Sequence, residues 1–159
     1  DTMYPPHYID THVRNLMKPG VACTFSLWSF IPDKRHSRLG LWLYECLRDL
    51  HLSIQAIKRP ELCVRGMTFG FNTELGRLFG FRTDIRRGED GSLALAMKPY
   101  GRLIFITSRK ARALTSNSTI DADGSLARSF GVRLLKALKG ATGLLYKKTT
   151  YKDKDSNLL

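Results

Sequence analysis

The clearest pattern near the start of the chain is an alternation of apolar and small polar residues from Val21 to Ile31. Core-type side chains recur at every second position, which is the pattern of a β-strand. We predict the first strand here. Residues 1–20 contain three prolines and few core-type residues, which favours an extended N-terminal arm.

Two later segments have a helical period. After Ser37, a residue that can cap a helix, apolar residues recur at spacings of three and four, and we expect a helix over about 38–52 whose apolar face points inward. That face comprises Leu39, Leu43, Cys46, Leu47 and Leu50. A second helix is expected over 125–139, between a capping Ser125 and a terminating Gly140.

The segments between these helices favour strands. Residues 53–58 and 62–71 are candidate strands, whereas 72–81 fit either a short helix or a loop. Glycines at 88 and 91 suit a hairpin, so 83–108 is expected to be a three-stranded meander, followed by a polar loop over 109–124 and a last strand over 142–151. This order predicts an α+β fold with an antiparallel sheet. The arm (1–20) would precede one globular domain (21–151) and a charged tail (152–159).

Composition supports a folded, strongly basic domain. The chain has 159 residues, of which 43% are hydrophobic, and a net charge of +12. Residues 1–100 contribute 14 basic and 10 acidic side chains (+4), and residues 101–159 contribute 12 and 4 (+8). Such a charge favours a polyanionic partner. No apolar run is long enough to cross a membrane, and the chain starts with Asp rather than Met, as a trimmed chain would.

Motifs of known enzymes are few. The sequence has no GxSxG, CxxC, HExxH or P-loop, and none of its four histidines has another ligand at metal-binding spacing, so we expect no metal and no cofactor. One alternative is similar to coenzyme A-dependent N-acetyltransferases: the turn 35–40 before a helix, followed by Asn72 and the segment 78–81. Helix-start amides could bind a pyrophosphate. Arg38 stands where that family has its first glycine, and only about 35 residues precede the turn.

The most specific short motif is Pro5-Pro6-His7-Tyr8, a PPxY sequence. Adjacent prolines favour polyproline II, the shape that WW domains bind in an aromatic-lined groove. Pro5, Pro6 and Tyr8 are therefore candidate WW-domain contacts. The alternative is a rigid leader that packs on its own domain.

A late cluster of cations is the second candidate site. Eight basic residues fall within 27 positions, with Asp153 as the only acidic residue among them. They are Arg128, Arg133, Lys136, Lys139, Lys147, Lys148, Lys152 and Lys154. Each basic side chain near an anionic membrane contributes about 1 kcal/mol of binding free energy. An acidic membrane is the favoured partner, and non-specific binding to nucleic acid is the alternative.

The PPxY arm, the order of elements and the basic charge together resemble the matrix proteins of rhabdoviruses and related negative-strand RNA viruses. The resemblance implies a non-enzymatic structural protein located beneath the virion envelope, and at the inner face of host membranes and in the cytoplasm. Its implied partners are anionic membrane, viral nucleoprotein, further copies of itself and a host WW-domain ubiquitin ligase that would bind Pro5, Pro6 and Tyr8. The competing hypotheses are the acyltransferase and a basic nucleic-acid-binding regulator.

Overall fold

A computed structural model of the chain describes residues 2–85 and 88–117 and the single residues Arg128 and Gly131. Its described part is a mixed α+β fold, which confirms the predicted class. The helices are α1 (Tyr8–Leu16), α2 (Arg38–Lys58), α3 (Thr73–Phe79) and α4 (Glu89–Met97). The strands are β1 (Thr2–Met3), β2 (Val21–Ser26), β3 (Trp28–Phe30), β4 (Phe69–Phe71), β5 (Arg102–Ile106) and β6 (Ala113–Thr115).

The described strands form two small sheets. One has the order β4-β2-β5, with β2 antiparallel to β4 and parallel to β5, so that Phe25 pairs with Phe69 on one side and Phe105 on the other. The other has the order β1-β6-β3, with β6 antiparallel to β1 and parallel to β3. The prediction of a purely antiparallel sheet is therefore wrong. Long connections containing helices allow the parallel pairings.

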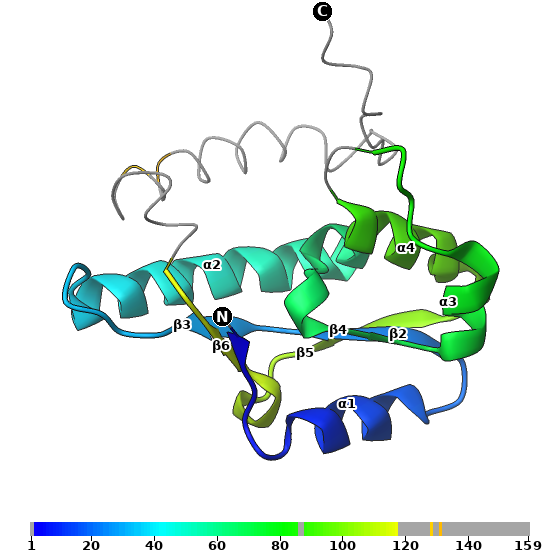
Figure 1. Cartoon of the computed structure of the whole chain (residues 1–159), viewed down its shortest axis with the longest axis horizontal. Helices are drawn as coiled ribbons and strands as arrows, with labels where there is room; N and C mark the ends of the chain where they lie inside the picture. The colour runs from blue at the N-terminus through cyan, green and yellow to red at the C-terminus, as the bar shows by residue number, and fades with distance from the viewer. Residues whose placement is uncertain (1, 86–87, 118–127, 129–130, 132–159) are drawn as a thin grey trace, which may run out of the picture.

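The helices cover the strands from two sides. Helix α1 lies against one face of β2 and β4, and α2 and α4 lie on the opposite side (Figure 1). Every residue of β2 is buried, as expected for a central strand between two layers. The core between the layers includes Phe25, Leu93 and Met97, none of which is more than 1% exposed.

The first twenty residues are not an extended arm. Residues 8–16 form α1, whose buried residues Tyr8 and His12 point toward the strands, and β1 pairs with β6. Of residues 2–20, which the structure describes in full, 4–7 and 17–20 lie outside helix and strand. The prolines were misleading because Pro5 and Pro6 precede the helix, where proline is tolerated.

The first predicted helix is longer than expected, and the strand predicted at 53–58 is wrong. Helix α2 continues to Lys58, and its apolar period continues with it through Ile54 and Ile57. It ends just before Pro60, whose ring disfavours helical geometry in the residue before it. Half of the next predicted strand, 62–71, is 3₁₀ helix (within Pro60–Cys63 and Gly66–Thr68), and only its last three residues form β4.

The meander predicted over 83–108 is also wrong. Glu89–Met97 is helical, and Gly88, with φ of 92°, is the left-handed residue that precedes α4 rather than the tip of a hairpin. Glu89 and Asp90 in the first turn suit the positive end of the helix dipole. Strand β5 exists within the predicted range, and 73–79 resolves as a helix. The helix predicted at 125–139, the strand at 142–151 and the tail at 152–159 lie outside the described residues, except that Arg128 and Gly131 are helical.

Candidate membrane-binding surface

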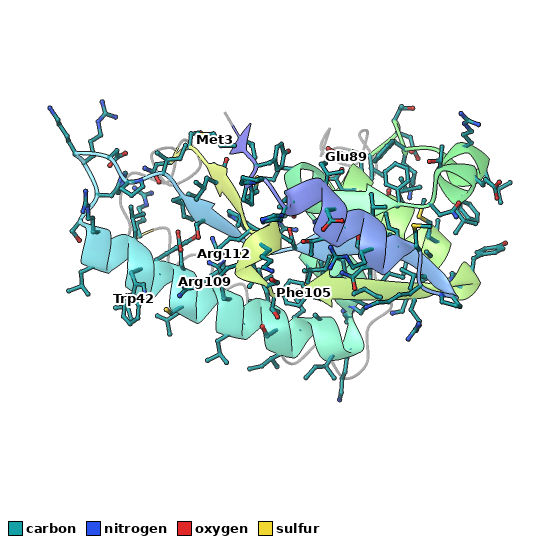
Figure 2. All side chains as sticks on the ribbon, turned by 90° about the horizontal axis from the view of Figure 1, so that it is seen from below. Met3, Trp42, Glu89, Phe105, Arg109 and Arg112 are labelled. Carbon is teal, nitrogen blue, oxygen red and sulfur yellow. The ribbon has the colours of Figure 1, made fainter. Side chains whose placement is uncertain are left out.

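Helix α2 presents its apolar side to solvent. The apolar face of α2 consists of seven large side chains at helical spacing, each between 39% and 80% exposed: Leu39, Trp42, Leu43, Leu47, Leu50, Ile54 and Ile57. Figure 2 shows Trp42 projecting from α2 away from the strands. The expectation that Leu39, Leu43, Cys46, Leu47 and Leu50 point inward is therefore wrong, since all five are exposed. Seven large apolar side chains exposed along one side of a helix favour an interaction site.

The opposite side of α2 is held inward by charged groups. Arg48 donates a hydrogen bond to the carbonyl oxygen of Trp28, pairs with Asp49 at 2.7 Å, and lies 4.4 Å from the centre of the Trp28 ring. Arg112, next to β6, pairs with Asp49 as well. Burial by itself lowers the pKa of Arg48, and the neighbouring Asp49 opposes that shift.

Glu45 completes this contact. One carboxylate oxygen accepts a hydrogen bond from the Ser29 hydroxyl at 2.8 Å, and the other accepts one from the Phe30 backbone N–H at 2.7 Å. Leu41, Tyr44 and Leu52 add the buried apolar contacts of the same side. Both carboxylates of α2 are bound inward, to β3 and to Arg112. The structure describes the whole of α2, and its outward side carries no carboxylate.

Cations flank both ends of the apolar face. Lys34, Arg35 and Arg38 are exposed at the start of α2, and Lys58 is exposed at its end. Asp33 precedes them, and its carboxylate accepts hydrogen bonds from Asn117 and from the His36 backbone. A helix of 21 residues is about 30 Å long. The surface is thus a long apolar strip between two basic ends.

The PPxY segment is packed against the domain. Tyr8 is only 7% exposed, and its hydroxyl donates to the carbonyl oxygen of Met67 at 3.3 Å. Its ring lies between those of Tyr4 and His12, with both centroid distances 4.5 Å. Burial raises the pKa of Tyr8 to about 12. Pro5 is partly buried and Pro6 is exposed, so the structure does not present the three candidate contacts together on the surface.

His12 contacts two hydroxyl side chains inside the domain. Its Nδ1 lies 2.8 Å from the Thr24 hydroxyl, and its Nε2 lies 3.3 Å from that of Ser26. Burial lowers the pKa of His12 to about 4. A histidine that activates a hydroxyl is usually oriented by a third group on its other nitrogen. Here both nitrogens face hydroxyls and the residue is 5% exposed, which favours a packing role.

The segments that resemble an acetyltransferase form helix caps. The Ser37 hydroxyl accepts a hydrogen bond from the Gly40 N–H at 3.1 Å, so this amide at the start of α2 is occupied. The Asn72 side chain accepts from the N–H groups of Glu74 and Leu75 at the start of α3. Both caps satisfy donors that the first turn of a helix leaves without partners.

The predicted basic site is almost entirely beyond the described residues. Arg128 is exposed, whereas Arg133, Lys136, Lys139, Lys147, Lys148, Lys152 and Lys154 are not described. The apolar face of α2 was not predicted to be a surface, although the sequence has one signal for it: Glu45, Arg48 and Asp49 share the side opposite the apolar residues. The partner Arg112 lies far along the chain, so the ion pair that holds this side inward could not be recognised from the sequence.

Within the described residues, no group of three or more His, Cys, Asp or Glu side chains could hold a metal ion, and no helix could span a membrane. No protein-family model matches this chain, and comparison with curated proteins and with solved structures found no match.

Proposed function

We propose that this chain is a non-enzymatic structural protein of the viral matrix type that binds the surface of anionic membranes through α2. The observation that supports the proposal is the apolar face of α2, with Arg35 and Arg38 at one end and Lys58 at the other. An interfacial helix of this kind lies in the plane of the bilayer, with its apolar side chains below the headgroups and its cations beside them.

The free-energy contributions of these side chains favour a lipid surface over water. Full burial of a Leu or Ile side chain contributes about 1.5–3 kcal/mol, and the apolar face has six such side chains in addition to Trp42. Full insertion of all six would contribute about 9–18 kcal/mol, whereas micromolar binding corresponds to about 8 kcal/mol. The flanking cations add about 1 kcal/mol each with anionic lipid, and Trp is favoured at the headgroup level.

The wider role rests on the charge and on the PPxY motif. A net charge of +12 suits a protein that lies between anionic lipid and a nucleoprotein core. Self-association, contact with a viral nucleoprotein, recruitment of a WW-domain ubiquitin ligase, and a place beneath a virion envelope belong to the proposal as features of the family that the sequence resembles.

The membrane contact can be tested by vesicle flotation together with Trp42 fluorescence. The full chain is expected to float with phosphatidylserine-containing vesicles and much less with neutral ones. Trp42 is 60% exposed and Trp28 is 6% exposed, so a difference spectrum against Trp42→Phe isolates the emission of Trp42. On binding, that emission should shift to shorter wavelength and be quenched by lipids brominated near the headgroups.

A matched pair of variants locates the contact. Leu43→Gln with Leu50→Gln changes two exposed positions of α2, and Ile9→Gln with Val13→Gln changes two exposed positions of α1 on the opposite side. The first pair should weaken vesicle binding at least tenfold, and the second should leave it unchanged. Exposed substitutions of this kind alter stability by about 0.5 kcal/mol or less, so both proteins are expected to fold.

Three outcomes would refute the proposal. Equal flotation of both pairs would place the contact away from α2. Vesicle-free monomer in which acrylamide does not reach Trp42 would show that another part of the chain covers this face. A dimer that Leu43→Gln with Leu50→Gln converts to monomer, without vesicle binding by the parent protein, would assign the face to a second copy.

A further inference from the structure

The PPxY motif does not have the shape that a WW domain binds. The Tyr8 backbone N–H donates to the carbonyl oxygen of Pro5 at 2.9 Å, which closes a tight turn over the motif. His7 has φ of −93° and ψ of 9°. Polyproline II requires ψ near +145°. The backbone must therefore open at His7 before the two prolines and the tyrosine can lie along one groove.

The tyrosine of the motif is also the residue that is most deeply held. A WW domain contacts the tyrosine ring of a PPxY ligand, and here that ring is enclosed by Tyr4, His12 and the backbone at Met67. Tyr4 donates to the same Met67 carbonyl oxygen at 3.0 Å, although it is 49% exposed. The ring of Tyr8 cannot be bound by a partner while these contacts persist.

A short β-pairing fixes the other end of the segment. Thr2 pairs with Thr115, and Met3 pairs with Leu114, so β1 is the edge strand of its sheet (Figure 2). The pairing involves two residues on each strand. A ladder this short, beside an exposed Tyr4, is the part of the fold that local opening releases at least cost.

We infer that residues 2–8 form a latch that keeps the PPxY motif closed, and that a WW domain binds the chain only after this latch leaves the domain. The inference shares the WW-domain partner with the proposed function but is independent of the membrane surface. The apparent dissociation constant of the full chain then equals that of the open motif divided by the open fraction. Any condition that releases β1 and Tyr4 raises WW-domain binding without a change in the motif itself.

The test compares the motif free and folded. An isolated WW domain that binds PPxY peptides is titrated with a synthetic peptide of residues 2–12 and with the full chain, by calorimetry. We expect the full chain to bind at least about tenfold more weakly than the peptide, as a motif open one-tenth of the time or less would.

Two changes outside the motif move the latch in opposite directions. Tyr4→Ala removes one hydrogen bond and one ring contact, and it should strengthen binding by the full chain toward that of the peptide. Tyr100→Ala is the matched control, because Tyr100 is exposed and has one ring neighbour far from the latch. Met3→Cys with Leu114→Cys places two thiols at paired positions, where neighbouring strands allow a disulfide. Oxidation should then abolish binding, and reduction should restore it.

The results separate recognition from closure. A peptide that does not bind would show that the motif is not a WW-domain ligand, which overturns the inference and leaves the membrane surface untouched. Equal affinity of peptide and full chain would show that there is no latch. If WW-domain binding is unchanged after oxidation, and mass spectrometry confirms the disulfide, then the WW domain binds the motif without release of β1.

Discussion

Replacement of Tyr8 by Ala tests whether the PPxY tyrosine is part of the core. Removal of a buried aromatic ring costs about 3–5 kcal/mol of unfolding free energy. Tyr8 is 7% exposed and lies at the edge of the domain, so the lower end applies, about 3 kcal/mol. For a chain of this size each kcal/mol lowers the melting temperature by about 2–4 °C, which gives a fall of about 6–12 °C.

Tyr8→Phe separates the ring from the hydroxyl. It removes the donor to the Met67 carbonyl, but that oxygen keeps the hydrogen bond from Tyr4, so the expected cost is only about 0.5–1 kcal/mol. Thermal and urea unfolding followed by circular dichroism measures both variants. Ile9→Ala, at the next and exposed position of α1, is the control and should unfold like the parent.

A motif in an open arm would behave differently. In that case Tyr8→Ala would leave the melting temperature unchanged while abolishing WW-domain binding. If Tyr8→Ala has the same melting temperature as the parent and Ile9→Ala, the packing of residues 2–8 described above is wrong, and the latch inference is refuted as well.

Three further changes probe the same structure. Burial lowers the pKa of His12 from 6.5 to about 4, so His12 is protonated at a higher pH in the unfolded chain than in the folded one, and the unfolding free energy should fall by up to about 3 kcal/mol as the pH drops from 6.5 to 4. A plot of the urea midpoint against pH should have a shallower slope in His12→Gln, and parallel slopes would contradict a lowered pKa of His12. Arg112→Ala removes the cation, 22% exposed, that pairs with Glu45 and Asp49, although Arg48 still pairs with Asp49, and it should lower the unfolding free energy by about 2 kcal/mol in urea. The exposed Arg109→Ala should lower it by almost nothing, and equal costs would refute the role of the ion pairs. Gly76→Ala raises helix propensity but places a Cβ against the Phe71 ring, so it should destabilise by about 1–3 kcal/mol, and a higher melting temperature would disprove that contact.

Parts of the fold with a local signal could be predicted from the sequence. The alternation from Val21 predicted extended chain where β2 and β3 lie, but as one strand, whereas the chain breaks at Leu27 and the two strands belong to different sheets. Ser37 marked the start of α2, since its hydroxyl caps the first turn. The α+β class follows from such elements even where their pairing does not.

Segments whose structure depends on distant contacts could not be predicted in this way. Helix α4 has apolar residues on most sides and a glycine in its first turn, so its pattern fits a strand after a turn as well as a helix. What selects the helix is burial of Leu93, Ala94 and Met97 against the strands. Similarly, the parallel pairing of β5 with β2 joins residues about 80 positions apart, for which the chain has no local marker.

The orientation of α2 shows why the candidate site was missed. A period of three and four establishes that one side of a helix is apolar, but the assumption that this side faces the core holds only if the other side prefers water. Here the other side is bound to the protein, because Glu45, Arg48 and Asp49 find their partners on β3 and at Arg112. The apolar face is then left for another partner, and the cations at both ends of α2 favour an anionic bilayer. An amphipathic helix whose charged side chains are bound to its own protein is therefore a candidate docking surface rather than a core element.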